Sequence, residues 1–421
     1  MQKILEISCG LDVHKESVVA CIMKRRPWVI PEATETTEEM EIRTFGTFAK
    51  DLDELRGWVE WEGCRHVAME STGIYWVPVY GALEGAHGGE IELMVTNARH
   101  MKNVPGRKSD VDDSEWIATL LMAGLLRGSF IPPADVRELR ELTRYRKNIV
   151  RDIGTQKNRI EKYLVQSGVK LSTFLSDVFG VSGRNLLRVL ASRGRLTEAD
   201  VEAEAKAISR AKKDEIKTSI KGELGEHQRE FLKMQVAHLD ELQRHLAAVE
   251  ASVAEKSKPF EREIERVDTI PGIAATAATA LIAEVGVDMG RFPTAEHFCS
   301  WAGVAPGSNE SAGKKKPAGV MQGNHYVKGL VCECAWSVVR MRNTYLSSFY
   351  WKVKQKRGAK KAIIALSRKI LVIVYNLLKH GTVYSEDHYE AAKCSQEAFR
   401  LKKLNADAKR LGLALVPMAH A

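Results

Sequence analysis

Two long stretches of this 421-residue chain repeat apolar residues at steps of three and four positions among dense charges. Such spacing puts the apolar side chains on one face of an α-helix, so each stretch is expected to form a long amphipathic helix. Coiled-coil or antiparallel hairpin arms satisfy the pattern, and so does an ordinary helical bundle. The first stripe consists of Val136, Leu139, Leu142, Tyr145, Ile149, Ile153, Ile160 and Leu164, and the second of Leu232, Val236, Leu239, Leu242, Leu246, Val249 and Val253.

Composition limits the class of protein. A chain of this length with 44% hydrophobic residues can bury a sizeable core and is expected to form two or three domains. The net charge of +9 favours a polyanionic partner, although such a charge also serves solubility alone. Seven scattered cysteines without a CxxC pair indicate neither zinc nor a redox motif and fit a reducing cytoplasm.

No segment of the sequence resembles a signal peptide or a membrane span. The N-terminus becomes charged too early for a signal peptide, and the apolar runs are shorter than a spanning helix. We therefore expect a soluble, cytoplasmic protein without a membrane partner.

The first 133 residues alternate strand-like and helical patterns. Residues 4–23 contain two β-rich apolar runs around a polar turn, which predicts a hairpin with Asp12 near the end of its first strand. After this hairpin another strand ends at Glu70, and a further apolar segment covers residues 91–98. A basic loop and a long apolar helix follow, so we expect an α/β domain over residues 1–133.

The remainder divides into three further parts. Residues 134–265 hold the two helical stripes, and residues 266–380 form a second, mainly helical domain. The latter starts with a short helix, a Pro-Gly turn and an Ala-rich helix, similar to a helix-hairpin-helix element that offers backbone N–H groups to phosphate. A loop rich in Gly, Ser and Lys covers residues 303–324, and residues 381–421 are expected to form a polar tail.

The stretch GRKSDVDDSEW, at residues 106–116, places four acids behind two basic residues. On a helix that begins near Ser109, Asp110 and Asp113 share the sector of Ile117, Leu120, Leu121 and Gly124, whereas Asp112 and Glu115 point to the other side. Asp112 is explained as a capping acid that pairs with Ser109 and favours the helix dipole. Asp110 and Asp113 are expected to approach the sheet, where two carboxylates repel each other unless a cation or a proton compensates.

The acids at the two strand ends complete a candidate cluster. Either Asp12 or Glu70 alone would be interpreted as a turn residue. Together with Asp110 and Asp113 they supply oxygen donors without His or Cys, which is what a hard cation such as Mg²⁺ or Mn²⁺ requires. Two such ions would polarise a phosphodiester and activate the attacking oxygen.

Several of these motifs, together with two in the C-terminal half, resemble one family. GLDVHK, AMESTGIYW and RKSDVDDSEWIA are similar to the motifs of the RuvC-like domain of DEDD insertion-sequence transposases, the IS110 family, whose members are guided by a bridge RNA. IPGIAATAATALIAEVGVDMGRF and FCSWAGVAPGSNESAGKKK resemble the second catalytic domain of that family. The resemblance spans nearly the whole chain in the expected order. It implies a RuvC/RNase H-like α/β domain, coiled-coil arms and a mainly helical serine transposase domain.

The resemblance also implies roles for individual residues. It makes Asp12, Glu70, Asp110 and Asp113 the metal-binding set and Ser311 the nucleophile that attacks DNA. It implies a dimer or tetramer joined by the helical arms, with donor DNA, target DNA and a structured RNA as partners. Without it Ser311 would be interpreted as a turn residue; the bare sequence adds only Lys314, Lys315 and Lys316, which could stabilise phosphate charge.

Basic residues also indicate contact with nucleic acid elsewhere. The stretch KVKQKRGAKK contains Lys354, Lys356, Arg357, Lys360 and Lys361, which could neutralise phosphates. The neighbouring Tyr345, Tyr350 and Trp351 are better explained as core residues than as stacking platforms. The loop that contains Lys108 suits a contact with the nucleic-acid backbone.

Three other functions remain open on the sequence. A site-specific DNA invertase could have the same two domains. In a RuvC-like nuclease or junction resolvase water would attack and Ser311 would be idle. A coiled-coil architectural DNA binder would need none of the acids.

Overall fold

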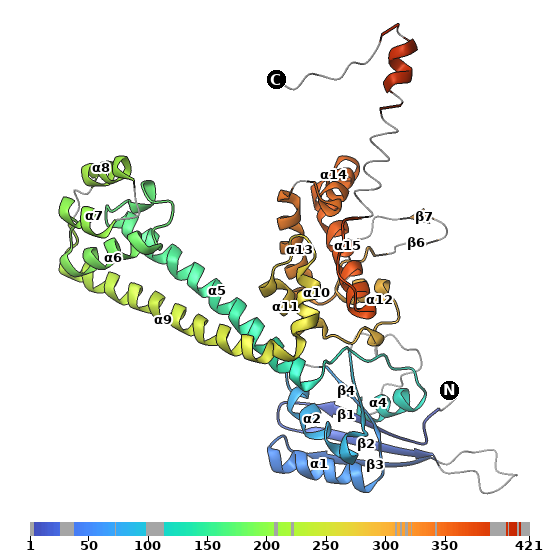
Figure 1. Cartoon of the computed structure of the whole chain (residues 1–421). Coiled ribbons are helices and arrows are strands. Elements are labelled where there is room, and N and C mark those ends of the chain that lie inside the picture. Colours follow the sequence, from blue (N-terminus) through green and yellow to red (C-terminus); the bar gives the residue numbers. More distant parts are fainter. Residues whose placement is uncertain are drawn as a thin grey trace, which may run out of the picture. The chain divides into compact units, whose positions relative to one another are not determined.

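The computed structural model describes two compact units, residues 1–131 and 132–421, which are taken separately below (Figure 1). The described residues are 4–25, 38–71, 73–97, 113–205, 209–219, 223–307, 310–311, 314–315, 319–320, 322–341, 343–387, 401–402, 404–410 and 412–413. None of the helices in these ranges is both long and apolar enough to cross a membrane.

The first unit is built on a five-stranded mixed sheet in the order β3-β2-β1-β4-β5. β1 pairs antiparallel with β2 and parallel with β4, β3 extends the antiparallel side, and β5 extends the parallel side. The predicted hairpin and the strand ending at Glu70 are confirmed, whereas β3 was not predicted. The strands are β1 (Ile7–Val13), β2 (Val18–Arg25), β3 (Glu38–Phe45), β4 (His66–Glu70) and β5 (Glu92–Thr96).

Helices cover both faces of this sheet. Helices α1 (Ala49–Trp61) and α2 (Trp76–Leu83) pack on one face, where Leu55 and Leu83 join Leu11 and Met69 in the core. The 3-10 helix η1 (Ala86–Gly89) follows α2.

Helix α4 (Asp113–Met122) packs on the other face of the sheet. Ile117, Leu120 and Leu121 point toward Ala68 of β4, as the helical phase predicted, while Gly124 is exposed beyond the helix end. The predicted start of this helix near Ser109 lies outside the described residues.

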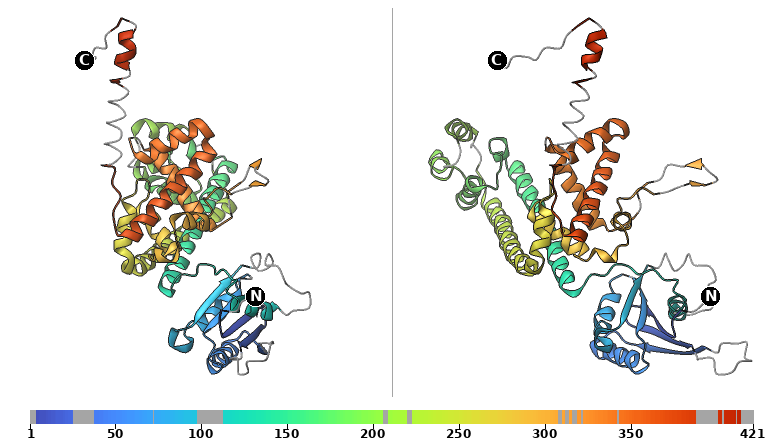
Figure 2. Two further views of the ribbon diagram at one scale, coloured as in Figure 1. Left: turned by 90° about the vertical axis from the view of Figure 1, so that its right-hand side faces the viewer. Right: turned by 45° about the vertical axis from the view of Figure 1, so that its right-hand side comes forward.

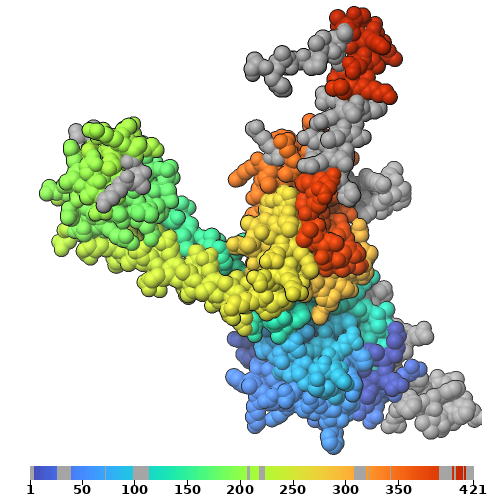
Figure 3. Space-filling view, in the orientation of Figure 1, coloured from blue at the N-terminus to red at the C-terminus, as the bar shows by residue number. Residues whose placement is uncertain are grey.

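The second unit contains two long helices that run side by side, α5 (Ala134–Gln166) and α9 (Glu226–Ser257) (Figures 1 and 2). Most of their buried residues belong to the predicted stripes, including Leu139, Ile160 and Leu239. Thr143 and Gln156 are buried as well, and Tyr145 is exposed. Small helices cap the far end of this arm, whose surface is visible in Figure 3. They are η2 (Leu171–Thr173), α6 (Val181–Arg193), α7 (Glu198–Glu204) and α8 (Arg210–Ser219).

The rest of the second unit is a helical domain at the base of the arm. The predicted helix, Pro-Gly turn and Ala-rich helix correspond to α10 and α11; Gly272 in the turn has a φ of +83° and lies against α13, where a side chain would clash with Val338. The elements are η3 (Lys258–Phe260), α10 (Glu261–Asp268), α11 (Ala275–Val285), η4 (Met289–Arg291), α12 (Ala295–Trp301), β6 (Glu310–Ser311), β7 (Lys314–Lys315), α13 (His325–Arg340), α14 (Tyr345–Arg357) and α15 (Ala359–His380).

Residues 384–386, at the start of the predicted polar tail, contact the helical domain. The backbone N–H of Tyr384 donates to Thr269, and the carboxylate of Glu386 accepts from the backbone N–H of Tyr345 at the first turn of α14. A carboxylate at a helix N-terminus is favoured by the helix dipole. Residues 384–386 therefore tie the ends of α10 and α14 together.

Candidate functional site

Asp12 lies on the face of β1 that α4 covers. Side chains alternate along a strand, so Ser8, Gly10 and Asp12 share that face. Gly10 allows α4 to come close, because a Cβ atom there would lie 2.1 Å from the carbonyl oxygen of Ser114. The Ser8 hydroxyl donates a hydrogen bond to the carbonyl of Ala118 at 3.1 Å. Two small residues thus fix α4 on the strand that carries Asp12.

Glu70 lies at the same sheet edge on the neighbouring parallel strand. Gly10 pairs with Ala68, and Leu11 pairs with Met69, so the register continues to Asp12 and Glu70. Ala68 packs against residues of α4, which places Glu70, two residues further, on that same face. The carboxyl ends of two parallel strands therefore bring both acids to one end of the sheet.

Asp113 is the first described residue of α4 and directly precedes Ser114, which contacts β1. Its position is thus set by the close packing at Gly10. Burial raises the pKa of Asp12; the charges of Asp113 and Glu70 raise it further, while His14 lowers it. Asp113 and Glu70 are therefore each close enough to Asp12 for their negative charges to disfavour its ionised form.

His14 is a neighbour of Asp12 that sequence reasoning missed. Its Nε2 lies 3.0 Å from Oδ2 of Asp12. The motif GLDVHK contained the signal, because residues two apart on a strand point to the same side.

The donor set suits a hard cation, although no group of three His, Cys, Asp or Glu in the described part of the chain is arranged to hold a metal ion. Asp110, Asp112 and Lys108 lie outside the described residues. A further oxygen comes from Thr96, which pairs with Glu70 in the sheet. Its hydroxyl is fully buried and has no hydrogen-bond partner within the described ranges. Asp12, Glu70 and Asp113 are the described carboxylates at this end of the sheet.

Ser311 belongs to the second unit and lies on a two-stranded hairpin. β6 pairs antiparallel with β7, so that Ser311 is opposite Lys314 and Glu310 is opposite Lys315. The predicted loop is thus partly a hairpin. Lys316 lies outside the described residues.

The base of this loop is closed by backbone contacts. Pro306 forms a β-bridge with Val320, and the backbone N–H of Gly307 donates to Gly319 at 2.9 Å. Gly323 lies close to Gly303: a Cβ atom on Gly323 would be 2.3 Å from the backbone nitrogen of Gly303. The segment that bears Ser311 therefore leaves the helical domain from a fixed root.

A buried ionic network supports that root. Glu284 of α11 is buried and accepts two hydrogen bonds from Arg144 of α5 and one from the side-chain amide of Asn324. Asn324 also caps α13, where its side chain accepts from the backbone of Tyr326 and Val327. A single Glu within the apolar run of α11 was the only sequence signal for this network.

The predicted basic residues lie on α14 and α15. Lys356, Arg357, Lys360 and Lys361 are exposed, and Lys354 is half-buried with its amine 4.3 Å from the ring centroid of Trp351. Of the aromatic residues assigned to the core, Tyr350 is buried, but Trp351 is 46% exposed.

Comparison with known proteins found matches to two family models. Residues 9–168 match a family model named for the DEDD domain of IS110 and described as transposase, and residues 264–351 match the model of the transposase IS116/IS110/IS902 family. An uncharacterized 43.6 kDa protein of insertion element IS110 from Streptomyces coelicolor is 30% identical over 122 residues, which are 28% of this chain and 29% of that protein. A putative transposase, y4pF/y4sB, from Sinorhizobium fredii is 24% identical over 156 residues, or 35% of this chain and 40% of that protein.

The matched class is that of the transposases, enzymes that cut and rejoin DNA. Two parts of the chain therefore match IS110-family transposase domains: residues 9–168, which begin in the first unit and continue through α5, and residues 264–351 in the second unit. The chain's matches span less than half of the length of either relative.

Proposed function

We propose that this protein is a DNA transposase of the IS110 type that cuts and rejoins DNA at the ends of an insertion element and at its target. The observation that carries the proposal is the convergence of Asp12, Glu70 and Asp113 at one end of the sheet, within a region that matches a DEDD transposase model. In the proposal this is a RuvC-like domain, and Asp110 is the fourth acid. The acids would hold Mg²⁺ or Mn²⁺, which polarises a phosphodiester when bound.

Ser311 is the proposed nucleophile. Its hydroxyl oxygen gives up its proton and forms a bond to phosphorus, the bond from phosphorus to the sugar oxygen breaks, and the departing sugar oxygen takes up a proton to become a hydroxyl. A later attack by a sugar hydroxyl on the serine–phosphate bond rejoins DNA and restores the serine. Lys314 pairs with Ser311 in the hairpin, and a cation there would stabilise phosphate charge. Lys315, Lys316 and Lys108 are proposed as further phosphate contacts.

The C-terminal helices favour a polyanion as partner. Residues 334–385 contain no Asp or Glu. Over the same range eleven Lys and Arg occur, namely Arg340, Arg342, Lys352, Lys354, Lys356, Arg357, Lys360, Lys361, Arg368, Lys369 and Lys379. A region with this imbalance attracts nucleic acid through its phosphates, with an affinity that falls steeply as salt rises. Lys354, Lys356, Arg357, Lys360 and Lys361 are the proposed contacts.

Covalent trapping tests the nucleophile. Purified protein is incubated with Mg²⁺ and labelled element-end DNA, denatured, and separated by gel electrophoresis. We expect a protein–DNA adduct that Ser311→Ala abolishes and the matched variant Ser308→Ala retains. Turnover without an adduct would favour the nuclease or resolvase alternative, in which water attacks.

The acid cluster has its own test. Asp113→Ala should abolish strand cleavage with folding retained. Asp112 is the predicted capping acid, so Asp112→Ala should reduce strand cleavage only slightly. Equal losses at both positions would contradict the assignment of Asp113 to the metal site. Unchanged activity in Asp12→Ala and Asp113→Ala would favour the architectural DNA binder.

Guidance by a bridge RNA, and assembly into a dimer or tetramer through α5 and α9, complete the proposal. Purification of the expressed protein with its bound nucleic acid, followed by sequencing of any RNA, tests the guidance. A discrete structured RNA is expected, and its absence would count against guidance. Element ends beside the gene would separate a transposase from an invertase of the same architecture.

A further inference from the structure

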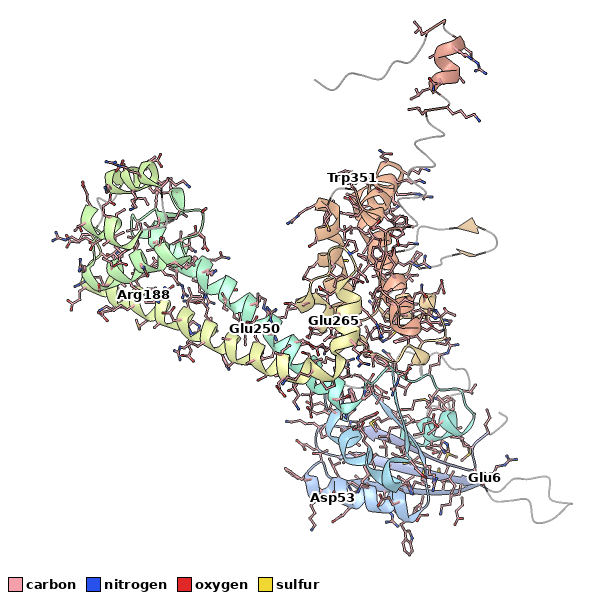
Figure 4. The ribbon with its side chains drawn as sticks, viewed as in Figure 1. Glu6, Asp53, Arg188, Glu250, Glu265 and Trp351 are labelled. Carbon is pink, nitrogen blue, oxygen red and sulfur yellow. The ribbon has the colours of Figure 1, made fainter. Side chains whose placement is uncertain are left out.

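Two tryptophans on the C-terminal helices are exposed rather than buried. Trp336 of α13 and Trp351 of α14 each have 46% of their surface accessible. Both flank the ring of Tyr350, which is buried, with centroid distances of 6.3 Å and 5.3 Å. Figure 4 labels Trp351 on α14. The two indoles are therefore held by a rigid aromatic neighbour while much of their surface stays open.

One cation lies against Trp351 and Tyr350. The amine of Lys354 lies 4.3 Å from the ring centroid of Trp351 and 6.0 Å from that of Tyr350. Lys356 and Arg357 are exposed on the same helix, and neither is ion-paired with an acid in the described part of the chain. An exposed indole can stack on a flat ring, and a cation without an acidic partner can bind a negative charge. The surface therefore suits a partner that has both flat rings and negative charge.

We propose that Trp336 and Trp351 form a stacking platform for unpaired bases of a nucleic-acid strand, whose phosphates contact Lys354, Lys356 and Arg357. The proposal rests on the proposed function only in that this domain binds nucleic acid. Duplex bases already stack on one another, so their faces are not free for an indole, whereas unpaired bases offer both faces. Self-association through this surface is opposed by the like charges that two copies would bring together.

Binding measurements with matched oligonucleotides test the platform. Full-length protein, freed of bound nucleic acid at high salt, is titrated against single-stranded DNA, single-stranded RNA of the same sequence, and duplex DNA, with fluorescence anisotropy as the readout. Trp336→Ala and Trp351→Ala should each weaken binding of at least one kind of single strand roughly 5- to 150-fold, the range for one stacked base. Duplex binding should change less than about twofold.

Control variants separate stacking from folding. Trp336→Phe and Trp351→Phe keep an aromatic face and should retain most of the affinity. Trp61→Ala, at a position 86% exposed on α1 of the other unit, should leave all affinities unchanged. The kind of single strand, DNA or RNA, whose binding the alanine variants weaken is the one that uses the platform.

Three results would overturn the proposal: single-strand affinities unchanged in both alanine variants, equal losses for single strands and duplex, or a smaller oligomer in sedimentation with unchanged binding. The last result would make the surface a contact between copies. Each differs from failure of the proposed function, which would appear as the lack of a Ser311-dependent adduct in wild-type protein.

Discussion

The carboxylate of Glu284 and the guanidinium of Arg144 form a two-point ion pair across 140 residues of sequence, with Nε to Oε1 at 2.6 Å and Nη2 to Oε2 at 2.8 Å. Glu284 lies on α11 and Arg144 on α5, so the pair fastens the base of the arm to the helical domain. Arg140 donates to the carbonyls of Ala283 and Glu284 at the last turn of α11, and burial lowers its pKa to about 10. Glu284 also accepts a hydrogen bond from Asn324. One chain of hydrogen bonds therefore links the arm to the root of the loop that carries Ser311.

Replacement of Glu284 by Gln should destabilise the second unit by about 3 kcal/mol, because two guanidinium groups would lose their buried counter-charge. The measurement is urea unfolding followed by circular dichroism. Glu250→Gln is the matched control. Glu250 pairs with Arg146 of the same helix α5 at 2.7 Å, but the Glu250 side chain is 45% exposed, against 5% for Glu284. Its loss should cost less than about 1 kcal/mol. Equal costs at the two positions would contradict a special role for the buried pair.

Asn324→Ala should impair the proposed chemistry more than it impairs the fold. The substitution removes a helix cap, worth about 1 kcal/mol, and the contact that joins Glu284 to the loop root. Thr344→Ala removes the comparable cap of α14, where Thr344 accepts from the backbone of Ser347. We expect similar thermal shifts but a clearly lower rate of adduct formation for Asn324→Ala alone. Similar adduct rates would show that Asn324 only stabilises α13.

The sequence predicted those parts of the fold whose side chains alternate or repeat strongly. The β1–β2 hairpin, β4 and the two long helices all have such patterns. The edge strand β3 was missed because half of its residues, EEMEIRTF, are charged and its residues 39–44 are exposed, so that backbone pairing with β2 holds it. Helix α14 mixes aromatic and basic residues without a clear apolar face, so the sequence did not reveal that Tyr350 is buried while Trp351 stays exposed.

The sequence predicted those parts of the candidate site that depend on residues close together in the chain. The phase of α4 and the strand ends indicated how Asp113, Asp12 and Glu70 converge. The partners of Glu284 could not be predicted, because Arg144 and Asn324 are 140 and 40 residues away and nothing local distinguishes them from other polar residues. The orphaned hydroxyl of Thr96 depends on the register of β5 against β4, which a single sequence does not reveal.

Gly10→Ala should displace α4 and with it Asp113. The new Cβ would meet the backbone of Ser114 and Ala118 at 2.1 and 2.4 Å, and a backbone cannot rotate away as a side chain can. We expect a loss of about 2 kcal/mol or more in the stability of the first unit and a loss of strand cleavage. Gly57→Ala in α1 is the control, since nothing lies within 4 Å of its Cβ position. That variant should be as stable as wild type or slightly more so, by up to about 1 kcal/mol.

Asp12→Asn should stabilise the metal-free protein and remove its response to Mg²⁺. The pKa of Asp12 is raised by burial and by Asp113 and Glu70, so the folded state binds its proton more tightly than the unfolded state does. The stability of the wild type should therefore fall as pH rises from the ordinary Asp pKa of 3.8 to the raised pKa of Asp12. Above the raised pKa the ionised carboxylate of Asp12 keeps the folded state at this lower stability. At pH 7 we expect a gain of up to about 1 kcal/mol for Asp12→Asn, seen as roughly 3 to 5 °C in the melting temperature of the first unit. Mg²⁺ should raise that temperature in wild type and in Asp53→Asn, an acid on α1 away from the sheet end, but not in Asp12→Asn. A Mg²⁺-dependent rise that persists in Asp12→Asn would contradict the assignment of Asp12 as a metal ligand.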